Sequence, residues 1–199
     1  MGMYIQDAKK GVVEYLRNCV PNTTAVAVHF MNSGEIKLQS DLIALAVEIQ
    51  EKRLDSGGTP FFNTLKKALE STPTPTRLVA FTDGSPTDSL QGEGGAEVIQ
   101  YYQNNLDAWK ASANVIITIA KSFNTEKCIP IDTVFFGYAR QERELELLKY
   151  LSDATGGIFL HFDPAKINFR TAFKYLAPAY RAQLTDGSFR AAVERGEKV

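Results

Sequence analysis

The sequence has few cysteines, few histidines and no long apolar run. Its 199 residues include two cysteines and two histidines. Two cysteines are too few for a disulfide framework or a cysteine-based zinc site, which favours a reducing compartment. No apolar run approaches the roughly 20 residues that a membrane span requires. We therefore expect a cytoplasmic protein without a membrane segment, provided that Met1 is the true start.

The chain also lacks an excess of charge of either sign. Its 22 lysines and arginines balance 23 aspartates and glutamates, which leaves a formal net charge of −1. This balance gives no general electrostatic reason to bind nucleic acid or an anionic membrane. A hydrophobic content of 44% over this length fits one globular domain with an ordinary core. Any partner must therefore be recognised through local features.

The pattern of apolar residues predicts alternating helices and strands. Helical spacing covers residues 4–19, 41–54, 61–71, 96–111, 115–127, 141–155 and 165–176. Strand-like runs cover residues 23–31, 35–39, 77–81, 131–136 and 158–162. This alternation predicts an α/β fold, in which helices cover both faces of a mostly parallel sheet with one antiparallel edge strand. Ligands of such sheets bind at the carboxyl ends of the strands.

Two loops carry the residues with recognisable chemistry, one of which enters a helix while the other leaves a buried strand. Residues 55–60 read Asp-Ser-Gly-Gly-Thr-Pro before a helix, and residues 82–85 read Thr-Asp-Gly-Ser after a buried strand. In this order the two motifs resemble the von Willebrand factor type A family, where both contribute to a metal-ion-dependent adhesion site. The resemblance covers a domain of residues 1–180, and residues 181–199 are predicted to form a polar tail.

The resemblance implies a three-layer, doubly wound, Rossmann-like fold and a protein-binding module that is not an enzyme. It also implies that Thr59 supplies a hydroxyl and Asp83 a carboxylate to Mg²⁺ or Mn²⁺. Gly58 and Ser85 would line the ligand-binding rim, a term used below for Gly58, Thr59, Asp83 and Ser85 together. Magnesium takes about six oxygen ligands, so an acidic residue of a partner protein could complete the site.

The sequence departs from the family at its beginning. The family's first strand ends in Asp-x-Ser-x-Ser and supplies three further metal-site residues, whereas this chain contains no such motif. We therefore expect a degenerate or truncated site that binds magnesium weakly, and we predict that restoring the strand recovers binding and stability together. Because that strand is central in the family's sheet, its loss would expose two adjacent strand edges. Truncation is the explanation we favour, and a strand donated by another chain, oligomerisation or a fold that closes the gap stay open.

Other interpretations of the same residues also stay open. The domain could act in assembly without a metal, or, less favoured, Asp83 could serve a metal-dependent hydrolase whose nucleophile and base are not recognisable in the sequence. Asp83 and Gly84 also suit an ordinary turn, and Thr59 with Pro60 suits the start of a helix. The charged run at 142–149 is typical of a solvated helix face with i to i+4 pairs.

Overall fold

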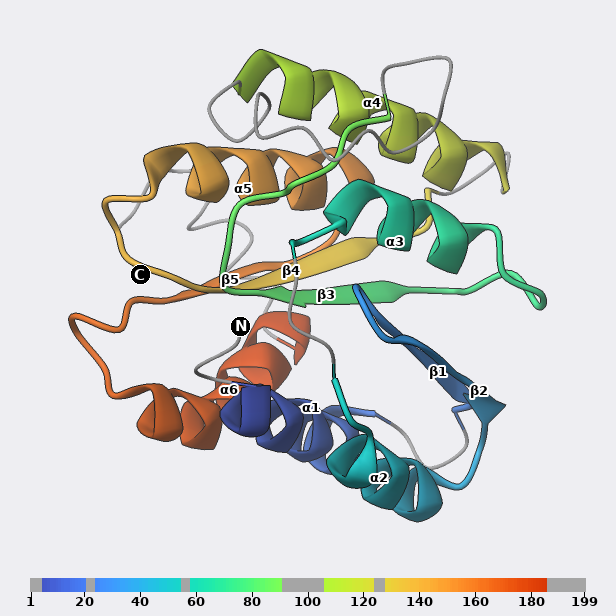
Figure 1. Cartoon of the computed structure of the whole chain (residues 1–199), viewed down its shortest axis with the longest axis vertical. Coiled ribbons are helices and arrows are strands. Elements are labelled where there is room, and N and C mark those ends of the chain that lie inside the picture. The colour runs from blue at the N-terminus through green and yellow to red at the C-terminus, as the bar shows by residue number, and fades with distance from the viewer. Residues whose placement is uncertain (1–4, 21–23, 55–57, 91–105, 124–127, 186–199) are drawn as a thin grey trace.

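The computed structural model of this chain describes residues 5–20, 24–54, 58–90, 106–123 and 128–185. Within these ranges the chain forms six helices, a parallel sheet of three strands and a separate two-stranded antiparallel hairpin (Figure 1). The predicted α/β class is therefore confirmed. The expected single sheet is wrong for the described residues, because its strands divide into two groups. None of the described helices is both long and apolar enough to cross a bilayer.

The element bounds follow the predicted order. The helices are α1 (Ile5–Cys19), α2 (Leu42–Glu51), α3 (Phe61–Leu69), α4 (Leu106–Ser122), α5 (Glu142–Thr155) and α6 (Phe169–Thr185). The strands are β1 (Val26–Phe30), β2 (Gly34–Gln39), β3 (Leu78–Thr82), β4 (Ile131–Phe136) and β5 (Phe159–Phe162).

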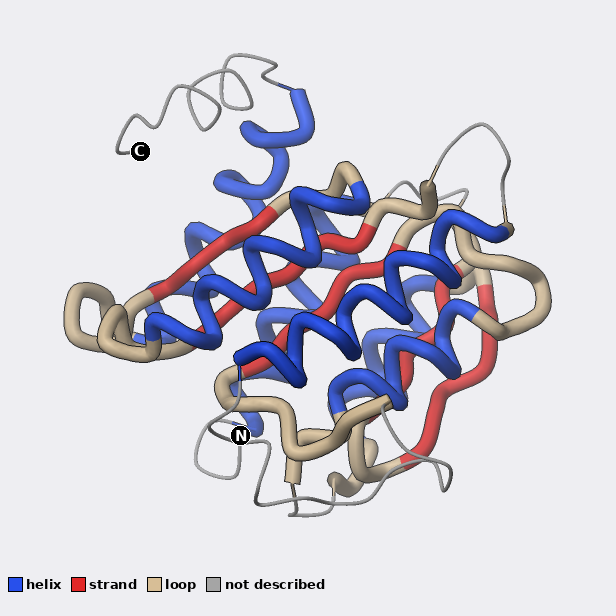
Figure 2. Tube along the Cα trace, turned by 90° about the horizontal axis from the view of Figure 1, so that it is seen from above, coloured by secondary structure: helices blue, strands red, loops and turns tan. Residues whose placement is uncertain are grey.

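The parallel sheet has β4 between β3 and β5. All six residues of β4 are buried, as expected for a strand with a neighbour on each side and helices on both faces. The hairpin pairs β1 with β2 in antiparallel register from Val26 opposite Gln39 to Phe30 opposite Gly34. Viewed from above, the strands follow one another as β5, β4, β3, β1 and β2, with β2 outermost (Figure 2). The prediction of an exposed antiparallel edge strand at 35–39 is confirmed by β2.

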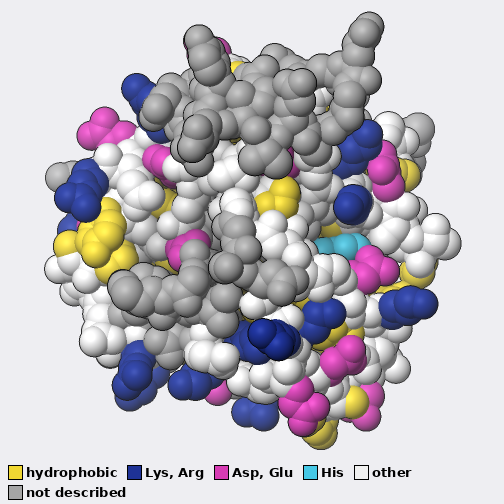
Figure 3. Space-filling model, in the orientation of Figure 1, with side chains coloured by type: hydrophobic (Ala, Val, Ile, Leu, Met, Phe, Trp, Pro, Cys, Tyr) yellow, Lys and Arg dark blue, Asp and Glu magenta, His cyan; other side chains and the backbone are white. Residues whose placement is uncertain are grey.

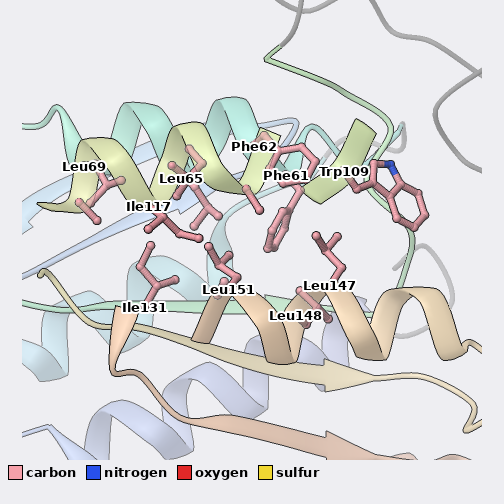
Figure 4. Packing of buried hydrophobic residues seen from close by; sticks show 14 of the residues in the cluster. Phe61, Phe62, Leu65, Leu69, Trp109, Ile117, Ile131, Leu147, Leu148 and Leu151 are labelled. Atoms are coloured by element: carbon pink, nitrogen blue, oxygen red, sulfur yellow. The ribbon is translucent and has the colours of Figure 1, made fainter. Parts of the chain in front are cut away.

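Helices lie on both faces of the strands. α3, α4 and α5 lie on one face, and α1, α2 and α6 lie on the other (Figure 1). Each face has its own apolar cluster. The first contains Phe61, Phe62, Ile117, Leu147 and other residues from α3, α4 and α5 (Figure 4), and the second contains residues from α1, α2 and α6. At about 25 cal/mol per Å² of apolar surface removed from water, these two clusters supply the main stabilisation of the domain.

Two predicted helix boundaries are wrong. A break between 111 and 115 was expected, but α4 runs without interruption from Leu106 to Ser122. Trp109, Ile116 and Ala120 are buried along one face of this helix, so burial against α3 and α5 overrides the strand preference of its β-branched residues. Residues 96–105 of the predicted helix lie outside the described ranges.

The last helix also extends further than expected. α6 continues through Pro178 to Thr185, so residues 181–185 of the predicted polar tail are helical and residues 186–199 lie outside the described ranges. The turn that contains Pro178 is held by Tyr180, whose side chain is buried and donates a hydrogen bond to Oδ2 of Asp132. This long-range contact ties α6 to β4 two residues beyond Pro178.

Candidate functional site

The Thr-Asp-Gly motif forms a turn directly after β3. Thr82, the last residue of the strand, is buried, and its hydroxyl lies 3.2 Å from Gly84 O and 3.4 Å from Gly84 N. These contacts hold the turn closed and leave Asp83 half-buried at the carboxyl end of the strand. The local interpretation of the motif as a turn is therefore correct. It is compatible with a role of Asp83 in binding.

The loop before α3 packs against this turn. Thr59 Oγ1 lies 3.7 Å from the position that a Cβ atom would take on Gly84. The carbonyl of Thr59 accepts hydrogen bonds from Phe61 N at 2.7 Å and from Thr87 N at 2.9 Å, which ties the loop to the segment after β3. The two loops that carry the sequence motifs are therefore in contact. Joint ligation of one ion by Thr59 and Asp83 stays a prediction.

Gly58 precedes Thr59 in the loop before α3 and is exposed to solvent. Asn32, in the turn of the β1–β2 hairpin, donates a hydrogen bond through Nδ2 to the carbonyl oxygen of Gly58. A Cβ atom on Gly58 would lie 2.4 Å from Oγ1 of Thr87, which is closer than van der Waals contact allows. The close approach of the Thr87 side chain to Gly58 therefore requires glycine at position 58.

Ser85 brings an acidic residue to the rim that sequence reasoning missed. Its hydroxyl donates a hydrogen bond to Oε1 of Glu144, which is half-buried in the first turn of α5. The prediction of a solvated helix face at 142–149 holds for Glu142, Arg143, Glu146 and Lys149, which are exposed, whereas Glu144 is half-buried. Glu146 pairs with Lys110 of α4, with Nζ and Oε1 2.5 Å apart. Because α5 follows β4, its first turn lies at the same carboxyl edge of the sheet as Asp83. This position in the predicted topology was the one signal that could have identified Glu144 as a neighbour of the rim.

The start of α3 is held by a residue that the sequence did not indicate. The helix is preceded by Pro60, which makes no side-chain cap, and the expected capping role of Thr59 is not observed. Asp88, which lies far from the helix in the sequence, caps the start of α3 instead. Its Oδ1 accepts from Phe62 N at 3.2 Å, and its Oδ2 accepts from Asn63 N at 2.7 Å and from Asn63 Nδ2 at 2.8 Å. Burial raises the pKa of Asp88, and the N–H groups of residues 62 and 63 oppose this effect.

The oxygen atoms near the rim are of the type that a hard cation such as Mg²⁺ prefers. There are fewer of them than such an ion needs to fill its coordination sphere. Thr59 and Ser85 offer hydroxyls, and Asp83 and Glu144 offer carboxylates. Magnesium prefers such donors but takes about six of them in octahedral geometry, some of which can be waters. Among the described residues, no group of three or more His, Cys, Asp or Glu side chains could hold a metal ion. Residues 55–57 of the first loop lie outside the described ranges.

A second buried polar cluster surrounds Asp132. This residue is fully buried in β4, and its carboxylate accepts from Arg77 Nε at 2.6 Å, from Arg77 Nη2 at 2.8 Å and from Ile158 N at 2.8 Å. Tyr180 donates a further hydrogen bond to it. Burial raises the pKa of Asp132, while Arg77 lowers it. Because all these contacts join β4 to neighbouring elements, we assign the cluster to structure and not to binding.

Comparisons of this chain with protein-family models, with curated proteins and with solved structures found no match. Interpretation of the rim therefore depends on the two loop motifs and on the contacts described above. The face of the molecule shown in Figure 3 carries positive and negative side chains interspersed around its periphery. This distribution agrees with the nearly balanced net charge and favours recognition through local groups.

Proposed function

We propose that this chain is a non-enzymatic protein-binding domain with the fold of the von Willebrand factor type A family. Its ligand surface is the rim of Gly58, Thr59, Asp83 and Ser85. The observation that carries the proposal is the contact of Thr59 with the Thr-Asp-Gly turn at the carboxyl end of β3. The parallel order β3, β4, β5 and the helices on both faces support it, because such sheets bind ligands at this edge.

In this proposal Thr59 and Asp83 hold a magnesium or manganese ion, which would bind an acidic residue of the partner protein. Asp83 supplies the charge and Thr59 a neutral oxygen, and the Glu144 carboxylate is engaged by Ser85. So few charged ligands give a weak site in the isolated domain, because magnesium gives up its hydration water reluctantly. The acidic residue of a partner would strengthen the site, so binding of the metal and binding of the partner should depend on each other.

The first test measures thermal unfolding in 5 mM MgCl₂ and in EDTA. A site with a Kd of about 10 mM or weaker adds roughly 0.2 kcal/mol at this concentration, which shifts the midpoint by less than about 1 °C. We expect this small shift in the wild type and none in Asp83→Ala. A large magnesium-dependent shift that Asp83→Ala abolishes would show that further residues complete the site, and the assignment of a weak two-ligand site would then be wrong.

The second test measures the recovery of protein partners on the immobilised domain. Retention in magnesium should be lost in EDTA and in Asp83→Ala. The matched control is Asp153→Ala, because Asp153 is an exposed carboxylate in the last turn of α5, away from the first turn that contacts the rim. Loss of partners in both variants alike, or retention in all conditions, would contradict the proposal.

A metal-independent assembly domain is the second candidate. It is favoured by the lack of a group of three or more His, Cys, Asp or Glu ligands within the described ranges. In that case the partners should remain bound in EDTA and in the Asp83→Ala variant. The two candidates therefore predict opposite outcomes in the same experiment.

A further inference from the structure

Two neighbouring helices carry an excess of positive charge. α6 contains Arg170, Lys174 and Arg181 and no acidic residue, and α1 contains three basic and two acidic residues. Together the two helices have six basic and two acidic side chains, a net charge of +4. The rest of the chain has 16 basic and 21 acidic side chains, a net charge of −5. The charge of a nearly neutral chain is therefore unevenly distributed.

These positive charges lie on one exposed surface. α1 and α6 lie side by side, since the rings of Tyr15 and Tyr180 are 4.9 Å apart and Arg181 donates a hydrogen bond to the carbonyl oxygen of Asn18. In Figure 3 lysine and arginine side chains gather over these helices, along the lower left of the view, and acidic side chains gather over α2. Apart from Glu14, the described charged side chains that the two helices expose are basic. They form a set that we call the basic face: Lys10, Arg17, Arg170, Lys174 and Arg181.

The segments outside the described ranges do not supply a matching negative charge. Residues 186–199, which follow α6, contain three acidic and three basic residues. The segments with a net negative charge, 55–57 and 91–105, lead into α3 and α4, which lie on the opposite face of the sheet from α6 (Figure 1). The complementary negative charge is therefore expected from outside this chain.

The arrangement of the basic face favours a planar partner. At about 1.5 Å per residue, its side chains are spread over about 16 Å of α6 and about 10 Å of α1. The face consists of the sides of two helices in one layer (Figure 1), whereas proteins that read a DNA duplex place a helix or strand inside a groove. Tyr175 is 55% exposed beside Lys174, and its amphipathic ring suits the headgroup level of a bilayer. A bilayer also presents its anionic headgroups in a plane.

We propose that the basic face binds the surface of a lipid bilayer that contains anionic headgroups. Each Lys or Arg held near such a surface strengthens binding about fivefold. Five basic side chains and Glu14 leave four net positive charges, so half-maximal binding is expected at about 1 mM lipid. The binding needs no metal and does not involve the rim, so this proposal and the proposed function can fail independently.

Co-sedimentation of the full chain with sucrose-loaded vesicles tests the proposal. Vesicles of phosphatidylcholine with about 30% phosphatidylserine are compared with phosphatidylcholine alone, in the presence of EDTA. We expect saturable binding to the anionic vesicles in about 50 mM NaCl. Binding should be at least about tenfold weaker in about 500 mM NaCl, because the Debye length falls from about 14 Å to about 4 Å. Asp83→Ala should leave the binding unchanged, which separates it from the metal-dependent rim.

A double variant tests the assignment to the basic face. Arg17→Gln with Lys174→Gln removes one exposed charge from each helix, and neither side chain has a hydrogen bond or ion pair with another described residue. The double variant should therefore keep the wild-type midpoint of thermal unfolding and bind anionic vesicles about 25-fold more weakly. The matched control is Lys121→Gln with Lys149→Gln, which removes the same charge from exposed positions of α4 and α5 and should bind as the wild type does.

Several results would overturn the proposal. These are equal binding to both kinds of vesicle, no binding up to about 5 mM lipid, and equal loss of binding in the two double variants. Tighter binding to a short DNA duplex or to polyglutamate than to the vesicles, at equal concentration of negative charge, would overturn it in favour of a nucleic acid or an acidic protein. A dimer in light scattering that Arg17→Gln with Lys174→Gln dissociates would overturn it in favour of a second copy of the chain.

Discussion

Replacement of Asp88 by alanine should destabilise the domain and loosen the rim. The Asp88 side chain is 1% exposed and accepts three hydrogen bonds at the start of α3, two of them from the backbone N–H groups of Phe62 and Asn63. These N–H groups have no partner within the helix because they belong to its first turn. Asp88 therefore fixes the helix that follows Thr59.

The size of the effect follows from these contacts. Each buried donor left without an acceptor costs about 1–3 kcal/mol, and loss of an N-cap costs about 0.5–2 kcal/mol. Removal of the carboxylate also relieves its desolvation, the effect that raises the pKa of Asp88, so the net loss lies at the lower end. We expect Asp88→Ala to lower the free energy of unfolding by about 2–3 kcal/mol, or the midpoint by about 5–10 °C.

Urea unfolding at constant pH measures this difference, with Asp107→Ala as control because Asp107 is exposed on α4. Asp88→Asn should lose less than Asp88→Ala, since its amide oxygen still accepts one of the backbone N–H groups. A loss below about 1 kcal/mol for Asp88→Ala would refute the reasoning, because it would mean that water replaces the carboxylate at the start of α3.

Two further predictions concern residues that join distant elements. Tyr180→Phe should lower the free energy of unfolding by about 1–3 kcal/mol in chemical denaturation, because buried Asp132 loses one donor. An unchanged value would show that the bond does not hold α6 beyond Pro178. N–H groups of Ala165 and Ala139 lower the pKa of Asp163. The stability advantage of the wild type over Asp163→Asn should therefore be complete above about pH 4 and disappear as the pH falls through the lowered pKa, and a difference independent of pH would contradict this.

Most of the element order was predictable because its signals are local. The Asp41 side chain accepts from Ile43 N and Ala44 N at the start of α2, as a helix N-cap does. Gly156 ends α5 with a φ of 72°, a left-handed conformation that glycine adopts without strain. Such signals act over a few residues, so they can be identified without knowledge of the fold. The resemblance of the two loop motifs to the von Willebrand factor type A family then led to the prediction that they would share one edge.

Contacts between distant residues could not be predicted in the same way. Asp88 caps a helix that begins 27 residues earlier in the chain at Phe61, and Glu144 reaches Ser85 across 59 positions. Nothing in the local sequence of either acidic residue distinguishes it from an ordinary surface carboxylate. Their roles depend on how α3 and α5 pack on the sheet, which is a property of the assembled core.

The sequence by itself therefore determined the α/β class, the order of its elements and the position of the rim motifs. Tertiary structure decided the continuity of α4 and the extension of α6 beyond Pro178. The physical reason is the range of the interactions. Helix spacing and caps depend on residues up to about four positions apart, whereas strand pairing and burial depend on residues that meet only after the chain has folded.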